Sequence, residues 1–434
     1  MSLHRYLAES PFGYCRNFGM PREVVTLAAR HFVTTLMDAY AKSKGKRRWA
    51  EKTPDNLMYL DFLAEMFPHA AFIHLVRDGL DNAISTSVIA PHRKGISDWH
   101  EKFLSLGPEC AVENNLFNAT LRWNHWNRRV DELMSGRRLL QVGYEKLVYE
   151  PRSVLQSIFE FIEEPFDPSA LDYARFQHDL PDCEWGSADV KHFTGITKER
   201  VGRSNELDSV ERELLLPITL YGRQDGTSSV SSQVGIAPTL DIEDRRGRLL
   251  MEYVNSFARS TGLAPLEELR AWAYSWLWLH ALHNIDWRNK KLVFMDTEAS
   301  PIPWILALLG AEVTLLDSFP ERIPVYASLR EKTKVRIHWR QANLPQIPVA
   351  DEYADILIST SLGQKSDDNR TVVAEMGRVL KKKGILALTF DFAKAEFEEL
   401  FWFNAAFGNL KPPDWRGEDI HLSGRLAAAV LRKA

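Results

Sequence analysis

Residues 48–85 constrain the fold of this chain more than any other stretch. The stretch begins within a short strand pattern over residues 46–51, which is followed by a polar loop and a helical pattern of leucines. An apolar strand over residues 71–76, a polar turn and a second helix complete it. Two buried-type strands that each open into a polar loop and a helix form the repeating unit of a parallel sheet. The stretch therefore predicts parallel strands flanked by helices.

Three side chains suited to an anion follow these strands. Lys52 follows the first strand, Arg77 follows the second, and Ser85 lies in the helix after it. Ligands of parallel sheets bind at the carboxyl ends of the strands. An amine, a guanidinium and a hydroxyl near a helix N-terminus suit an anion, most naturally a phosphate. By contrast, His74 inside the second strand is predicted to be a hydrogen-bonded core histidine.

The composition favours a soluble, cytoplasmic protein of two domains. A chain of 434 residues with 45% apolar residues can build two cores of ordinary size. The net charge of −4 argues against nucleic acid as a partner, and no apolar stretch is long enough to predict a signal peptide or a membrane span. Three scattered cysteines predict a reducing compartment, with neither a disulfide framework nor a metal site.

A run rich in glycine and serine divides the chain. Residues 222–238 read G-R-Q-D-G-T-S-S-V-S-S-Q-V-G-I-A-P, which is typical of a linker. We therefore predict a first domain over residues 1–221, a linker over residues 222–245 and a second domain over residues 246–434.

The second domain alternates strands and helices. Strand patterns occur at residues 291–296, 311–317, 335–339, 354–361 and 385–392. Helical patterns between several of them predict a doubly wound parallel sheet. The second of these strands ends in Asp317, and an acid at that place suits the two ribose hydroxyls of a bound nucleoside.

The first domain resembles a known enzyme family. The segments R-W-A-E-K-T-P, F-P-H-A-A-F-I-H-L-V-R-D-G-L-D-N-A-I-S and V-G-Y-E-K-L-V-Y-E-P are together similar to sulfotransferases that use 3′-phosphoadenosine-5′-phosphosulfate (PAPS). The motifs are most similar to the branch that contains tyrosylprotein sulfotransferases and many bacterial enzymes. The resemblance covers about residues 20–205. It implies a P-loop-like sulfotransferase fold.

The resemblance implies roles for five residues. Arg77 and Ser85 match the residues that hold the 3′-phosphate of the cofactor, and Lys52 matches the lysine that stabilises charge on the transferring sulfuryl group. Tyr144 matches a tyrosine that packs on adenine. The basic segment that ends at Arg203 occupies the place of a loop that covers the cofactor. From its composition alone, a solvated surface loop is an equal alternative.

One motif of the family is missing from the first domain. The family opens with a strand and a Gly/Ser/Thr-rich loop that cradles the 5′-phosphosulfate, and residues 1–50 contain no such loop. We therefore expect that this chain begins after that loop, and that sulfuryl transfer by the chain alone is weak or absent. The acceptor is expected to be a hydroxyl of a small molecule, a glycan or a lipid.

The second domain resembles class I S-adenosylmethionine (SAM) methyltransferases, which have a Rossmann-like fold. The similarity rests on Q-A-N-L-P-Q-I-P-V-A-D-E-Y-A-D-I-L-I-S-T-S and E-M-G-R-V-L-K-K-K-G-I-L-A-L-T-F-D-F and covers about residues 246–434. It implies SAM as a cofactor, with Asn343 at the adenine amine. The turn after the first strand, D-T-E-A-S-P-I-P-W, lacks the usual glycines. We expect Glu298 to pair with the amino group of SAM and Ser300 to help form this loop.

Two kinds of protein fit these observations. The first is a two-domain transferase that modifies one acceptor twice, with a sulfuryl and a methyl group. The second is a non-catalytic partner protein built from two nucleotide-binding domains, which the missing glycine-rich loops of both halves favour. A nucleoside or sugar kinase is disfavoured because the chain has no G-x-x-x-x-G-K-[ST] loop.

Overall fold

The computed structural model divides the chain into two compact units. It describes residues 19–92, 105–107, 110–175, 196–219, 233–235, 245–266, 268–278, 282, 285–295, 299–362, 369–391 and 426–432. The first unit contains residues 1–81 and 126–203, and the second contains residues 82–125 and 204–434. Because most of residues 222–245 lie outside the described residues, the predicted linker and domain boundaries stay predictions.

The first unit contains a pair of parallel strands. Strand β1 (Phe72–Val76) pairs with β4 (Leu139–Gly143) in a register that places Val76 opposite Gly143. The helices of this unit are α2 (Arg22–Ser43), η1 (Pro54–Tyr59), α3 (Leu60–Met66), α7 (Tyr144–Tyr149), α8 (Pro151–Phe161) and η2 (Pro168–Arg175). Proline occupies the first position of α8, where its missing N–H costs no hydrogen bond. The parallel pairing confirms the predicted strand type.

Helix α3 buries both of its faces, which makes it the centre of the first unit's core. Phe62 and Met66 pack with residues of α2 such as Val33. Leu60 and Ala64, on the other face, pack with a second apolar cluster. That cluster contains Val130 and Met134, with Leu57, Phe72, Leu133 and Leu139 packed against it. The apolar residues of α3 therefore pack into two separate clusters, one on each side of the helix.

The predicted strand over residues 46–51 is wrong, since these residues form no strand. Side chains fix this segment instead of a ladder of backbone hydrogen bonds. The Arg48 guanidinium donates to the Glu164 carboxylate at 2.9 Å, and the Trp49 indole donates to Asp38 at 3.0 Å. The sequence of this segment could not exclude a strand, because contacts with distant residues leave no periodic trace in the sequence.

The prediction for His74 is confirmed, because the imidazole is buried in β1 and hydrogen-bonds Asn127. Burial lowers the pKa of His74, and the hydrogen bond with Asn127 and the charge of Asp131 only partly oppose this effect. The histidine therefore belongs to the core of the first unit.

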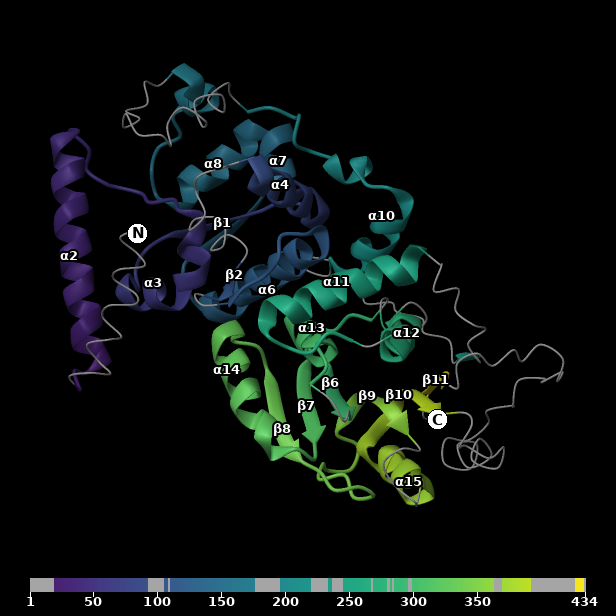
Figure 1. Ribbon diagram of the computed structural model, residues 1–434. Coiled ribbons are helices and arrows are strands. Elements are labelled where there is room, and N and C mark those ends of the chain that lie inside the picture. Colours follow the sequence, from purple (N-terminus) through teal and green to yellow (C-terminus); the bar gives the residue numbers. More distant parts are fainter. Residues whose placement is uncertain are drawn as a thin grey trace. The chain divides into compact units, whose positions relative to one another are not determined.

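The second unit contains a seven-stranded mixed sheet in the order β5-β11-β10-β9-β6-β7-β8. Its strands are β5 (Gln233–Gly235), β6 (Lys291–Met295), β7 (Glu312–Asp317), β8 (Ile337–Gln341), β9 (Ala354–Leu362), β10 (Leu380–Asp391) and β11 (Leu426–Arg432). Strands β10, β9, β6, β7 and β8 are parallel, whereas β11 and β5 add antiparallel at one side (Figure 1). The predicted mostly parallel sheet with helices around it is confirmed.

Helices cover this sheet and form the rest of the second unit. They are η4 (Arg203–Glu206), α10 (Ser209–Leu215), η5 (Leu216–Ile218), α11 (Arg245–Thr261), α12 (Glu268–Leu277), α13 (Ile302–Leu308), η7 (Pro320–Arg322), α14 (Ile323–Thr333) and α15 (Asn369–Val379). A small hairpin joins β2 (Ser105–Gly107) and β3 (Cys110–Ala111). Helices α4 (Gly79–His92) and α6 (Leu116–Met134) have residues in both units, and so does η4, because its first residue, Arg203, belongs to the first unit. Within the sheet's core, Val293, Leu357 and Leu388 are fully buried.

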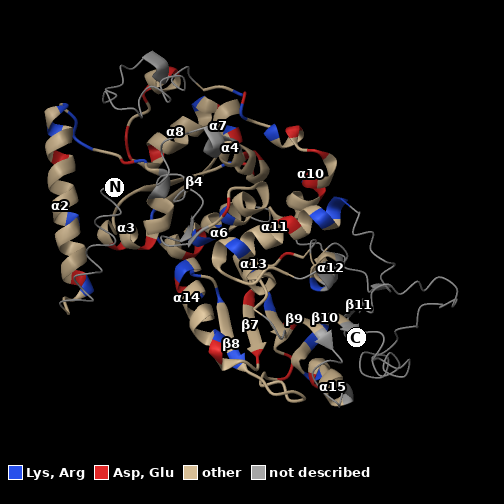
Figure 2. Cartoon of the chain, in the orientation of Figure 1, with Lys and Arg blue, Asp and Glu red and all other residues tan. Residues whose placement is uncertain are grey.

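Charged residues of both signs are mixed along the described part of the chain. Figure 2 shows basic and acidic residues interspersed along the described helices, in line with 54 basic and 58 acidic residues in the sequence. Among the described residues, no helix has the length and apolar character needed to cross a bilayer.

Candidate functional site

Arg77 lies at the carboxyl end of β1, directly before the N-terminus of α4. Asp78 caps this helix, because its carboxylate accepts the backbone N–H of Asp81 at 2.9 Å. The Arg77 guanidinium lies 3.6 Å from the Asp81 carboxylate, and their side chains are only 13% and 1% exposed. A cation that is largely buried at a helix N-terminus is well placed to hold an anionic group.

Tyr144 lies beside Arg77 in the first unit. It is the first residue of α7, directly after β4, and the parallel pairing of β1 with β4 brings the two strand ends together. The Arg77 guanidinium lies over the Tyr144 ring, 5.2 Å from its centre. The structure therefore gathers two of the predicted cofactor residues in one place, with a cation–π contact between them.

The last part of the predicted covering loop lies against the same strand end. The Arg200 carbonyl accepts a hydrogen bond from the Arg77 guanidinium, and the Gly202 N–H donates to the Asp81 carboxylate at 2.7 Å. Arg203, half-buried, follows directly. Residues 185–195 of this loop lie outside the described residues, so its role as a cover stays a prediction.

No hydrogen bond or ion pair within the described residues ties the other two predicted residues of the first domain, Lys52 and Ser85, to Arg77. Lys52 is exposed in the segment before η1. Ser85 is half-buried in the second turn of α4. The roles of Lys52 as catalyst and of Ser85 as phosphate ligand stay predictions.

In the second unit, Asp317 ends β7 and is almost fully buried. One carboxylate oxygen accepts the backbone N–H of Phe319 at 2.9 Å. The other accepts the Tyr326 hydroxyl at 2.8 Å and the Arg322 guanidinium at 3.1 Å. The Arg322 guanidinium also stacks over the Phe319 ring, 4.4 Å from its centre. The acid predicted to hold ribose hydroxyls is thus already hydrogen-bonded on both oxygens.

The pKa shifts of its partners reflect this network. Burial alone would lower the pKa of Arg322, but the Asp317 carboxylate outweighs it and the pKa rises above its ordinary value. Burial and the hydrogen bond to Asp317 both raise the pKa of Tyr326. Both partners therefore remain protonated donors to Asp317 at neutral pH.

Two further predicted SAM residues lie at the same edge of the sheet. Ser300 is buried, and its hydroxyl accepts the backbone N–H of Ile302 at 3.2 Å, so it stabilises the start of α13. Asn343 is exposed two residues after β8, next to Ala342, whose N–H donates to the Asp317 carbonyl at 3.2 Å. Glu298 lies outside the described residues.

Comparison with known protein families gives two matches along the chain. A model of the sulfotransferase family matches residues 6–168, and a model described as a methyltransferase domain matches residues 300–388. This chain joins a sulfotransferase-family domain to a methyltransferase domain. The two matches fall in the halves where the sequence predicts them.

Several curated relatives of this chain are protein-tyrosine sulfotransferases. The chain is 26% identical over 232 residues to the protein-tyrosine sulfotransferase of Drosophila melanogaster, and 24% identical over 162 residues to protein-tyrosine sulfotransferase 1 of Danio rerio. The matched parts are 52% and 35% of this chain, and 39% of each relative. A TehB-like SAM-dependent methyltransferase from Corynebacterium glutamicum is 18% identical, with a TM-score of 0.27, over 34% of this chain and 82% of that protein.

Several residues of these sites were missed by sequence reasoning. Asp81 carried a visible signal, because it follows Arg77 by four residues at the start of a helix, a spacing that permits an ion pair. Arg322 and Tyr326 gave no signal, since only the turn after β7 brings them back to Asp317.

Proposed function

We propose that the first domain transfers a sulfuryl group from PAPS to a hydroxyl acceptor. The observation that carries this proposal is the cluster at the end of β1, where the Arg77 guanidinium meets Tyr144 and the segment around Arg200. A guanidinium for a phosphate beside an aromatic ring for a base matches the two ends of a 3′-phosphorylated adenosine. The sulfotransferase-family match and the curated relatives support this assignment.

In this proposal each residue has one task. Arg77, together with Ser85 on the helix that follows it, holds the 3′-phosphate, and Tyr144 packs on adenine. The segment that ends at Arg203 covers the nucleotide. When bound, PAPS would supply the sulfuryl group: its sulfur–oxygen bond to the 5′-phosphate would break as the acceptor oxygen bonds to sulfur. Adenosine 3′,5′-bisphosphate would leave, and the proton of the acceptor hydroxyl would pass to solvent. Lys52 stabilises the negative charge that develops on the sulfuryl group and the leaving phosphate.

Binding and turnover test this proposal separately. Titration with adenosine 3′,5′-bisphosphate, the nucleotide product, is expected to show affinity well above that for AMP. Incubation with labelled PAPS and a panel of phenols, sugars and hydroxylated lipids measures transfer. We expect slow transfer, because the residues before Lys52 lack a glycine-rich loop for the 5′-phosphosulfate. Equal affinity for the bisphosphate and for AMP would argue for a partner protein instead of a sulfotransferase.

For the second domain we propose SAM as the ligand, bound at the carboxyl ends of β6, β7 and β8. The support is the methyltransferase-domain match and the shared edge that carries Ser300, Asp317 and Asn343. Glu298 would pair with the amino group of SAM. Arg322 competes with a ribose hydroxyl for one carboxylate oxygen of Asp317.

A comparison of two variants tests this second proposal. Thermal unfolding with S-adenosylhomocysteine is expected to show a small rise in Tm for the wild type and a larger one for Arg322→Met, in which the competing donor is gone. Arg330→Met, on α14, serves as the control with an unchanged ligand response. If millimolar ligand moves none of these transitions, the domain is a scaffold that does not bind SAM.

A further inference from the structure

Arg122 is a buried cation in the second unit that the proposed functions do not use. It lies on α6 and is only 7% exposed, and its Nη1 has no hydrogen-bond partner. Within the described residues it makes neither a hydrogen bond nor an ion pair. By contrast, Arg129 of the same helix pairs with Glu132 at 3.0 Å. A buried charge without a partner is strongly unfavourable, which points to a group that completes it.

Asn118 lies one turn before Arg122 and has a buried acceptor that lacks a hydrogen-bond donor. Its side chain is 1% exposed, and its Oδ1 accepts no hydrogen bond. Residues four positions apart lie on the same face of a helix, with Cβ atoms about 6 Å apart. An unsatisfied donor and an unsatisfied acceptor therefore lie on one buried face of α6.

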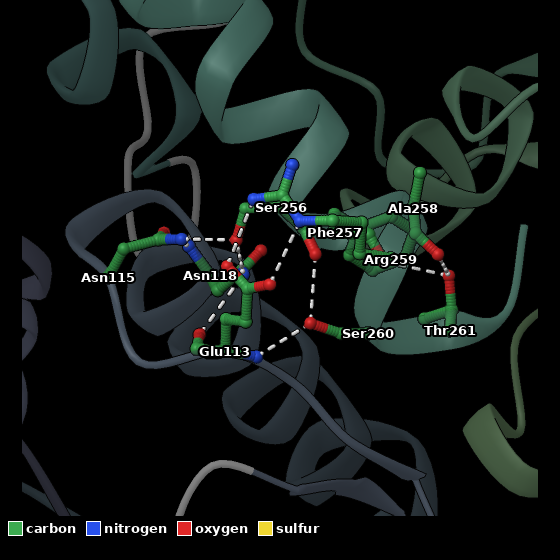
Figure 3. Close-up of polar contacts among 9 residues, drawn as sticks. All are labelled: Glu113, Asn115, Asn118, Ser256, Phe257, Ala258, Arg259, Ser260 and Thr261. Carbon is green, nitrogen blue, oxygen red and sulfur yellow. Dashed lines mark hydrogen bonds and ion pairs between the residues drawn. The ribbon is translucent and has the colours of Figure 1, made fainter. Parts of the chain in front are cut away.

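The orientation of the Asn118 amide is fixed by its neighbours (Figure 3). Its Nδ2 donates to the Glu113 carbonyl at 3.1 Å and to the Ser256 hydroxyl at 3.1 Å. A carbonyl can only accept, so the amide cannot turn its oxygen toward Glu113. The Asn115 amide, at 2.6 Å from the same hydroxyl, and the Arg259–Glu113 ion pair at 3.1 Å hold the network in place.

These contacts define the chemistry of the missing group. A single group that completes both side chains would offer a negatively charged oxygen to Arg122 and a hydroxyl hydrogen to Asn118, and it would be small because both side chains are buried. A phosphate that retains a proton has both parts. Sulfate, which is fully deprotonated at neutral pH, can satisfy Arg122 but has no hydrogen for Asn118. We propose that Arg122 and Asn118 form a binding site for a protonated phosphate group.

The electrostatics agree with this site. Burial lowers the pKa of Arg122 to about 10, so the guanidinium remains charged at neutral pH and keeps its demand for an anion. The inference is independent of PAPS or SAM binding, because it rests on neither Arg77 nor Asp317.

Thermal unfolding of the full chain tests the site. We expect the Tm of the wild type to rise saturably with inorganic phosphate, and sulfate at the same ionic strength to give a clearly smaller rise. Ethyl phosphate distinguishes free phosphate from a phosphate ester. If an ester is accepted, it should act at pH 6, where part of it keeps a proton, and lose its effect at pH 8.

Variants test whether the phosphate-induced rise in Tm comes from binding at Arg122. Arg122→Met is expected to lose the phosphate response and to be at least as stable as the wild type without phosphate, because it removes an uncompensated charge. Arg129→Met should keep the response, and so should Arg77→Met, which separates this site from the proposed nucleotide site. Equal effects of phosphate and sulfate on the wild type would overturn the proposal even if Arg122→Met does not fold. A full response in Arg122→Met would overturn it as well.

Discussion

Arg77→Met is expected to lower the affinity for adenosine 3′,5′-bisphosphate about 100-fold, or about 3 kcal/mol, which is the size of a desolvated charged hydrogen bond to phosphate. AMP, which lacks the 3′-phosphate, should lose at most about threefold. The difference between the two nucleotides is the decisive quantity, since Arg77 also pairs with the buried Asp81 carboxylate. Isothermal titration of both nucleotides measures it.

Arg138→Met is a matched control for this experiment. Arg138 lies directly before β4, at the opposite end of the strand pair, and its guanidinium lies 5.3 Å from the centre of the Phe161 ring, much as Arg77 lies over Tyr144. Both nucleotides should bind Arg138→Met as they bind the wild type. If Arg77→Met weakens AMP and the bisphosphate equally, Arg77 acts by holding the segment at Arg200 and does not contact the 3′-phosphate.

Asp317→Ala should lower the free energy of unfolding of the second unit by about 3 kcal/mol, because it removes a buried carboxylate with three hydrogen-bond donors. Arg322→Met should also destabilise, since it leaves the buried carboxylate with fewer donors. The double variant is expected to lose less than the sum of the two, by roughly 1 kcal/mol or more, as is usual for directly bonded partners. Denaturant unfolding, with the transitions of the two units followed separately, provides these values.

The exposed ion pair of Asp351 with Arg378 provides the control. Its atoms are 2.7 Å apart, but the Asp351 side chain is 76% exposed, so Asp351→Ala should cost less than about 1 kcal/mol. Strict additivity of Asp317→Ala and Arg322→Met would contradict the network described above. In that case Asp317 would be available for a ribose without any movement of Arg322.

The sequence predicted the parts of the fold that depend on local periodicity. The apolar runs of β6, β7 and β9 are separated by helical segments in the sequence, and they form the predicted parallel sheet. The segment around Trp49 shows the limit of such reasoning. Its side chains contact Asp38 and Glu164, which lie elsewhere in the chain, so the local sequence alone could not exclude a strand. The antiparallel edge formed by β11 and β5 was likewise invisible, because pairing between residues so distant in sequence leaves no periodic signal.

For the sites, the sequence predicted positions better than interactions. Strand ends are recognisable, so Arg77, Tyr144 and Asp317 could be named from motifs, and the structure places them at the ends of β1, β4 and β7. What the side chains contact depends on the path of loops. Arg77 hydrogen-bonds the Arg200 carbonyl because a segment distant in sequence folds back against β1. Likewise, the turn after β7 brings Arg322 back to hydrogen-bond Asp317. These partners determine which ligand atoms each site residue can contact, and only the structure identifies them.

Strand β11 has a practical consequence for any shortened form of this protein. It pairs with β10 on one side and with β5 on the other, so a chain ending before Leu426 would leave β5 without its partner and open the backbone of β10. Strand β10 contains Leu386, Ala387 and Leu388, all fully buried in the intact unit. An apolar strand with unpaired backbone groups readily joins the strands of other molecules. Truncation at this end would therefore be expected to yield aggregates, whatever the activity of either domain.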